Sequence, residues 1–269
     1  NLESREGIML RACYEKRYFI VESVKREFFS RYTHSLLGAT WAVLNPLSMI
    51  IVYMLVFSQV MRAKLPGIES GFAYSIYLCA GILPWGLFTE ISTRCVNTFI
   101  ENGNLLKKVA FPKICLPAIV TGSALINFSI ISGLFLFFLL CIGQFPGIVL
   151  LGTIPLLAIL ILFAASLGIF LGTVNVFFRD VGQGYGILCQ FWFWFTPLVY
   201  PASIVPERFQ NLLELNPMVQ IMGGFHTIFL EHQWPDYVSL LPITLLILVL
   251  AIVALLFFRC HSCEIVDEL

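Results

Sequence analysis

The 269-residue sequence contains 59% hydrophobic residues and only 12% charged residues, about half the charged share of an average soluble domain. Its mean hydropathy is +0.89, and its 16 basic and 16 acidic residues give a formal net charge of zero. These values exclude an ordinary soluble domain and give no indication of nucleic-acid binding. We therefore expect an integral membrane protein.

The first 35 residues carry charges throughout, without a signal-peptide pattern or a span. Apolar residues recur there at spacings of three and four, which predicts one helical face. The residues on this face are Leu10, Tyr14, Tyr18, Val21, Val24, Phe28 and Tyr32. Because charged residues occupy the other sides, residues 1–35 are predicted to form an amphipathic helix on the cytosolic membrane surface. A soluble cap helix is the alternative.

The rest of the chain, residues 36–269, is predicted to be an all-α transmembrane domain. A bilayer core of about 30 Å requires about 20 apolar residues in a helix. Six segments approach or exceed this length: 36–60, 72–98, 114–142, 149–177, 185–203 and 239–258. The long connection 204–238 contains apolar pieces too short to span, and we expect re-entrant helices there.

The distribution of Lys and Arg predicts the orientation of the six spans. Only Arg62, Lys64 and Arg208 would lie opposite the termini, and the other 13 of the 16 basic residues would lie on the same side as the termini. Because cytosolic loops carry an excess of basic residues, both termini are expected in the cytosol.

Five consecutive aromatic residues, Phe191 to Phe195, occupy the middle of the fifth predicted span. Successive helical residues turn by about 100°, so Phe191, Trp194 and Phe195 share a face while Trp192 points in another direction. Pro197 is expected to kink the helix, because it cannot donate a backbone hydrogen bond. The flat rings would suit a ligand with apolar C–H faces, such as a sugar, although an aromatic belt or simple packing remains possible.

Charged pairs and possible metal ligands are few. Glu90 and Arg94 are four residues apart and favour a structural ion pair, whereas Arg179 and Asp180 suggest an anchor or a gate. The spacing of His226, Glu231 and His232 fits a zinc hydrolase poorly. Cys260 to Cys263 would supply half of a zinc site at most, so no metal site is predicted.

Seven short motifs together resemble one family. They are RYTHSLLGATWAVLNP (31–46), LPWGLF (83–88), ENGNLLKKVAFPK (101–113), NVFFRDV (175–181), TPLVYP (196–201), VPERF (205–209) and LNP (215–217). In sequence and order they resemble the permeases of type II ABC exporters for polysaccharides, and the resemblance covers the chain from about residue 20.

The resemblance implies a half-transporter in the bacterial cytoplasmic (inner) membrane. Two copies of the permease would form the channel with two copies of a separate ATPase subunit, which would hold ATP and Mg, so no cofactor is expected on this chain. The implied substrate is a lipid-linked glycan of O-antigen type. Alternative substrates for the same fold are teichoic acid, capsule or a smaller lipid-linked molecule. A remote alternative function is a membrane-embedded hydrolase that uses His226 and His232.

The resemblance also implies roles for individual residues. The substrate path would include Tyr53, Phe57, Phe191, Trp192, Trp194, Phe195 and Tyr200. Coupling to the ATPase would use the cytosolic loop 101–113, with Glu101, Leu105, Lys107, Lys108, Phe111, Pro112 and Lys113. Residues 204–238 would form gate helices on the outer side. Arg179 and Asp180 are gate candidates from their position alone, at the cytosolic end of the fourth predicted span.

Within the loop 101–113, spacing alone predicts a short helix that ends at Pro112. Its apolar residues Leu105, Leu106, Val109 and Phe111 would form one face for docking on the ATPase. Alternatively, Lys107 and Lys108 simply follow the cytosolic excess of basic residues.

Overall fold

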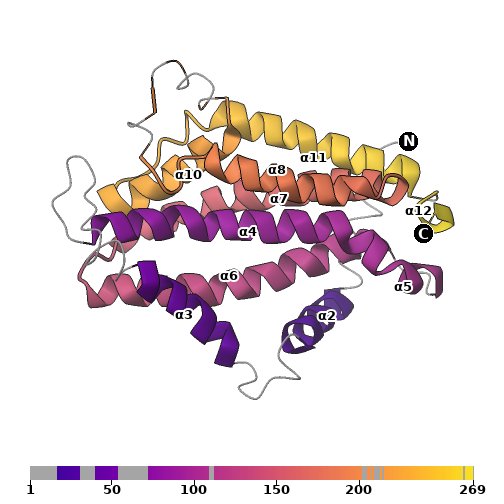
Figure 1. Cartoon of the computed structure of the whole chain (residues 1–269), viewed down its shortest axis with the longest axis horizontal. Helices are drawn as coiled ribbons and strands as arrows, with labels where there is room; N and C mark the ends of the chain where they lie inside the picture. The colour runs from indigo at the N-terminus through magenta and orange to yellow at the C-terminus, as the bar shows by residue number, and fades with distance from the viewer. Residues whose placement is uncertain are drawn as a thin grey trace.

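The computed structural model describes residues 17–30, 40–53, 72–108, 112–201, 205–206, 208, 213, 215–262 and 264–268. Within these ranges every regular element is a helix, which confirms the all-α prediction. Figure 1 shows the long helices lying side by side along the longest axis of the molecule, with α2 and α3 below them.

The helices follow in chain order, with short 3₁₀ and π segments. They are α2 (Arg17–Ser30), α3 (Trp41–Tyr53), α4 (Ala73–Glu101), α5 (Gly103–Lys108), α6 (Cys115–Cys141), η3 (Gly147–Gly152), α7 (Thr153–Phe177), α8 (Asp180–Trp194), α10 (Pro217–His226), η5 (Thr227–Glu231), α11 (Leu241–His261) and α12 (Glu264–Glu268).

The long helix α4 lies at the centre of the bundle and packs closely against α7. A Cβ atom on Gly168 of α7 would lie 2.5 Å from the Cβ of Cys95, and one on Gly172 would lie 2.7 Å from the carbonyl oxygen of Cys95. Small residues four apart allow two membrane helices to approach this closely. The pair α4–α7 is therefore the tightly packed part of the fold.

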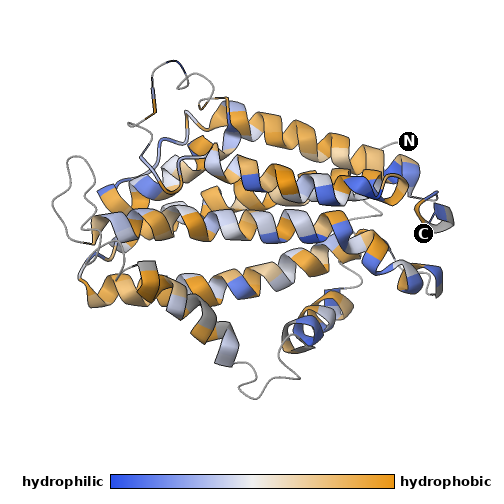
Figure 2. Cartoon of the chain, viewed as in Figure 1, coloured by the Kyte–Doolittle hydropathy of each residue, from blue (hydrophilic) through white to orange (hydrophobic). Residues whose placement is uncertain are grey.

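Among the described residues, four helices are long and apolar enough to cross a membrane: Ala73–Glu101, Cys115–Cys141, Gly147–Phe177 and Leu241–His261. Figure 2 shows α11 as an almost continuous hydrophobic helix, and Leu245, Val249 and Ile252 on it are 57–62% exposed. Such exposure suits contact with lipid. α3 and α8, with 13 and 15 residues, are shorter than the 18 residues required of a candidate span.

The fifth predicted span differs from the observed helix. α8 begins at Asp180 and ends at Trp194, so the prediction that a span covers 185–203 is wrong at its second half. Pro197 cannot donate to the carbonyl of Phe193, and the backbone N–H of Thr196 donates to that carbonyl instead, at 3.3 Å. The chain bends over residues 196–200, so the helix ends where a kink was predicted.

α2 confirms a helix over part of the amphipathic segment, and residues 1–16 and 31–39 lie outside the described ranges. Val24 is buried and faces Gly122 of α6, where a Cβ atom would lie 2.9 Å from its side chain. Val24 is therefore packed against α6, whereas Tyr18 and Val21, predicted to lie on the same face, are 77% and 52% exposed.

Free cysteines are distributed unequally between interior and surface. Four of those described are buried and two are exposed. The exposed ones are Cys141, at the last residue of α6, and Cys260, near the end of α11. In Figure 1 these two helix ends lie at opposite ends of the bundle.

Candidate functional site

Three of the five consecutive rings form an exposed aromatic surface on α8. Phe191, Trp194 and Phe195 are 64%, 63% and 67% exposed, on the shared face that their spacing predicted. Of these three rings, Trp194 borders a shallow pocket of about 410 Å³, which is lined by Trp85, Thr89, Cys189, Gln190, Phe193 and Trp194. Aromatic rings therefore line a surface depression along the helix.

Trp192 points the other way and packs into the core. Its ring meets those of Phe88 and Phe163 edge-on, with centroids 5.4 and 6.0 Å apart. Its indole N–H donates to Oδ1 of Asn216, at 2.9 Å. Of the other rings assigned to the path, the Tyr53 side chain and Phe57 lie outside the described residues.

The bend after α8 is held against α4 by tyrosine hydroxyls. Tyr77 donates to the carbonyl oxygens of Pro197 and Tyr200, at 2.7 and 2.8 Å. Tyr74 donates to the carbonyl of Val199, at 2.5 Å. The Tyr200 hydroxyl itself donates to the carbonyl of Trp194, at 2.6 Å, so this path candidate also stabilises the bend.

The predicted coupling segment is helical over Gly103–Lys108, and its two leucines point in different directions. Leu105 is 38% exposed, and Glu101 and Lys107 are also exposed. Leu106 is only 6% exposed and packs in a cluster with Phe99, Leu116, Phe258 and Ile265. The prediction of one common docking face is therefore wrong for Leu106, because adjacent helical residues diverge by about 100°.

The end of the coupling segment contacts the helix after α11. Ile265 of α12 is fully buried in the cluster that contains Leu106, and the ammonium of Lys113 donates to the carbonyl of Ser262. Pro112 is partly buried, whereas Phe111 and the Lys108 side chain lie outside the described residues. α12 and the base of α5 thus share one apolar cluster.

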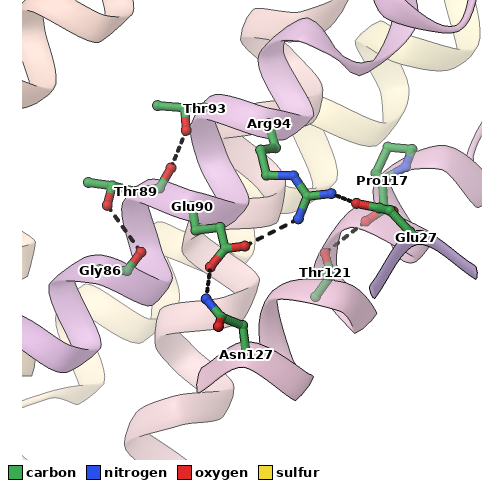
Figure 3. A network of polar contacts seen from close by, with 9 residues as sticks. All are labelled: Glu27, Gly86, Thr89, Glu90, Thr93, Arg94, Pro117, Thr121 and Asn127. Carbon is green, nitrogen blue, oxygen red and sulfur yellow. Dashed lines mark hydrogen bonds and ion pairs between the residues drawn. The ribbon is translucent and has the colours of Figure 1, made fainter. Parts of the chain in front are cut away.

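An ion-pair network joins α2, α4 and α6 (Figure 3). Arg94 contacts Glu90 at 3.3 Å, as its spacing predicted, and also pairs with Glu27 of α2. The second oxygen of Glu90 accepts a hydrogen bond from Asn127 of α6, at 2.9 Å. The Arg94 side chain is 26% exposed, so the network is partly shielded from solvent.

A pocket of about 460 Å³ opens beside this network, between α2, α4, α5 and α6. Arg26, Glu27, Arg94 and Glu101 are among the residues that line it. Sequence reasoning missed Glu27 and Asn127. Asn127, a polar residue within an apolar span, was the available signal for a polar contact.

Arg179 and Asp180, the predicted gate residues, are both exposed at the beginning of α8. Near the end of α7, shortly before them in the chain, the buried Asn175 donates to the carbonyl of Val96, at 3.1 Å, and accepts from the backbone N–H of Gly182, at 2.8 Å. Asn175 thereby ties the first turn of α8 to α4, a role that sequence reasoning missed.

The two histidines proposed for a hydrolase have separate environments. His226 stacks on Tyr77 with ring centroids 4.0 Å apart, and its Nε2 lies 3.1 Å from the carbonyl oxygen of Tyr77. His232 instead lies 3.4 Å from Oε1 of Gln144. No three His, Cys, Asp or Glu side chains gather as metal ligands within the described ranges, which omit Cys263.

The long apolar helices, the bend after α8 and the short buried helix α10 define a multi-pass helical membrane protein. The chain belongs to the ABC-2 type transporter family, whose match covers residues 19–230. This confirms the resemblance to type II ABC permeases.

Several characterised proteins are similar over most of their length. The O-antigen export system permease protein RfbA of Myxococcus xanthus is 32% identical over 97% of this chain and 99% of its own. An RfbA permease of Klebsiella pneumoniae is 29% identical over 85% and 87% of the two chains. The polysialic acid transport protein KpsM of Escherichia coli is 22% identical over 86% and 87%.

Proposed function

We propose that the chain is the permease subunit of an ATP-driven exporter that moves a lipid-linked polysaccharide of O-antigen type across the bacterial cytoplasmic membrane. The family and the names of the RfbA relatives support this class of substrate. The observation that carries the proposal is the exposed aromatic surface of Phe191, Trp194 and Phe195.

Exposed aromatic side chains suit a polysaccharide substrate that must slide through the transporter. Sugar rings present C–H faces that stack on aromatic side chains, and stacking depends little on which sugar is present. Rings that served only to fill the core would pack against other rings, as the partly buried Trp192 does against Phe88 and Phe163. In the proposed exporter the aromatic surface lines the path, and Trp192 supports it from behind.

The topology proposed for the exporter has six crossings with both termini in the cytosol. α3 and α8 would be the two crossings in addition to the four long helices. α10 and η5 comprise 10 and 5 residues, too few to cross a bilayer. Met218 and Ile221 of α10 are fully buried, and His232, with φ of 54°, ends η5 in the left-handed region. These features support a re-entrant segment on the outer side.

The proposed assembly contains two copies of the permease and two copies of a separate ATPase, which binds ATP and Mg. The chain would contact the ATPase through α5, where Leu105 and Lys107 are exposed. Hydrolysis would then act on α4, because only Asn102 separates the end of α4 from the start of α5.

The aromatic path is tested by replacing Phe191, Trp194 and Phe195 together with Ala. Cell-surface glycan should fall by tenfold or more in a strain that depends on this permease, while the amount of permease in the membrane and ATPase binding stay unchanged. Phe137→Ala is the matched control, since Phe137 of α6 is also 65% exposed. Full export by the triple variant would reject the aromatic path.

The coupling contact is tested by two neighbouring leucines. Leu105→Ala should weaken retention of the ATPase on the purified permease, by about 2 kcal/mol if Leu105 is a central anchor, roughly a thirtyfold change in affinity. Leu106→Ala should instead lower the melting temperature of the permease, because Leu106 is buried. Wild-type ATPase retention with Leu105→Ala would place the contact elsewhere.

A further inference from the structure

The side chain of Asn216 uses its full hydrogen-bonding capacity. Its Oδ1 accepts from the indole N–H of Trp192, at 2.9 Å, and from the backbone N–H of Met218, at 3.0 Å. Its Nδ2 donates to Oγ1 of Thr196, at 3.1 Å, and to the carbonyl of Phe195, at 3.4 Å. A carboxamide has two acceptor lone pairs and two donor hydrogens, so no capacity remains.

The partners also fix the orientation of this amide. The groups facing Oδ1 are N–H donors only, and the carbonyl of Phe195 is an acceptor only. An amide turned by 180° would place its N–H donors against the N–H donors of Trp192 and Met218. The hydrogen-bonding partners therefore determine which side-chain atom of Asn216 is the oxygen and which is the nitrogen.

Asn216 therefore does more than cap a helix. Capping α10 requires only the bond from Met218, and Asn216 is the N-cap residue of α10. The other three bonds go to the last turn of α8 and the bend that follows it. Through them the amide connects the start of α10 to the segment that carries the exposed aromatic surface.

Trp192 makes this connection firm. It turns inward beside the exposed Phe191, and it packs edge-on against Phe88 of α4 and Phe163 of α7. Its partly buried indole N–H would lose this partner if Asn216 moved away, and an unpaired donor is costly in an apolar setting. The position of α10 and the position of Trp192 thus depend on each other.

We propose that Asn216 and Trp192 form a positioning joint that sets the exposed aromatic surface relative to α10, so that the two move as one unit. The structural part of this proposal concerns α8 and α10 alone. Its consequence for transport rests on the proposed function, since it would link the path to the outer-side gate helices.

The test uses two substitutions that each remove the same bond. Trp192→Phe keeps an aromatic ring but removes the indole donor, and Asn216→Ser keeps a side-chain cap for α10 but withdraws the acceptor from Trp192. Glycan export should fall about fivefold or more in each variant, and the double variant should fall no further than the worse single one. Export that falls by the product of the two effects would overturn the joint.

A second measurement does not depend on export. Spin labels at Phe195→Cys and Gly223→Cys, in a cysteine-free parent, report the distance between the bend and α10, and Gly223 has open space around it. The distance distribution should be narrow in the parent and broader in both Trp192→Phe and Asn216→Ser. A distribution that stays narrow would overturn the joint. Broadening without any change in export would keep the joint and reject its proposed role in transport.

Discussion

The two ends of α8 are both held by an asparagine side chain, but the two attachments differ. At the first turn Asn175 is 1% exposed and binds backbone groups of α4 and of α8 itself. At the last turn Asn216 is partly buried and belongs to the ten-residue helix α10. The asparagine at the first turn comes from the long helix α7, whereas the one at the last turn caps a short helix and shares its task with the tyrosine hydroxyls of α4.

Both attachments are closely packed. At the bend, Leu198 is fully buried, and a Cβ atom on Gly81 of α4 would lie 3.2 Å from its side chain. A Cβ atom on Gly182, beside Asn175, would lie 2.8 Å from Oδ1 of Asn97, so the first turn of α8 has no room to move. The bend at the other end is held to α4 by hydroxyls of Tyr74 and Tyr77, and a hydroxyl can rotate between acceptors. The first turn of α8 is therefore attached through one buried amide, whereas the bend is attached through several separate side chains.

The largest effect is expected from Asn175→Leu, which would break the attachment of the first turn of α8. The substitution leaves the Gly182 N–H and the Val96 carbonyl without their side-chain partner in a buried place, at a cost of about 3 kcal/mol. The melting temperature of the purified permease should fall steeply. Asn104→Leu, at an exposed position of α5, is the control and should leave melting unchanged. Equal melting curves for both variants would contradict this attachment.

An intermediate effect is expected from Tyr77→Phe, which would loosen the bend and keep the ring stacked on His226. Loss of the hydroxyl removes the bonds to Pro197 and Tyr200, at a cost of about 1 kcal/mol. Tyr74→Phe removes the bond to Val199 and should cost less. Melting temperatures of the two variants give the ranking, and a larger loss with Tyr74→Phe would show that the bend is held mainly at Val199.

The smallest effect on stability is expected from Asp180→Asn. Asp180 is exposed in the first turn of α8, where a negative charge interacts with the helix dipole by about 0.5 kcal/mol. Because the fold barely depends on this carboxylate, a tenfold loss of export with unchanged melting would identify a gate function. Wild-type export in Asp180→Asn and in Arg179→Gln would remove both residues from the proposed gate.

Helical periodicity and apolar run length predicted the long helices well, because each depends on nearby residues. The same periodicity separated Trp192 from Phe191, Trp194 and Phe195, whereas the family resemblance grouped all four as path residues. The structure turns Trp192 inward. Its assignment to the substrate path stays a prediction, and its packing argues against that role. Local pattern was the better guide to side-chain direction.

Contacts between distant segments could not be predicted from spacing. The i, i+4 pair of Glu90 and Arg94 was visible in the sequence, but Glu27 comes from another helix. Asn175 and Asn216 were polar residues in apolar surroundings, a signal that something binds them but not what. The position at which α8 ends could not be predicted either, because the carbonyls of Pro197 and Val199 accept hydrogen bonds from Tyr77 and Tyr74 of the distant helix α4.

The two exposed cysteines provide the molecule with native reporters of its sidedness. Cys141 and Cys260 sit at opposite ends of the bundle, while Cys79, Cys95, Cys115 and Cys189 are buried. Once Cys13 and Cys263, which lie outside the described residues, are replaced by Ser, a membrane-impermeant thiol reagent added to intact cells should reach Cys141 alone if the termini are cytosolic. Cys260 should react only after the membrane is opened, so the protein can report its own orientation without an introduced label site.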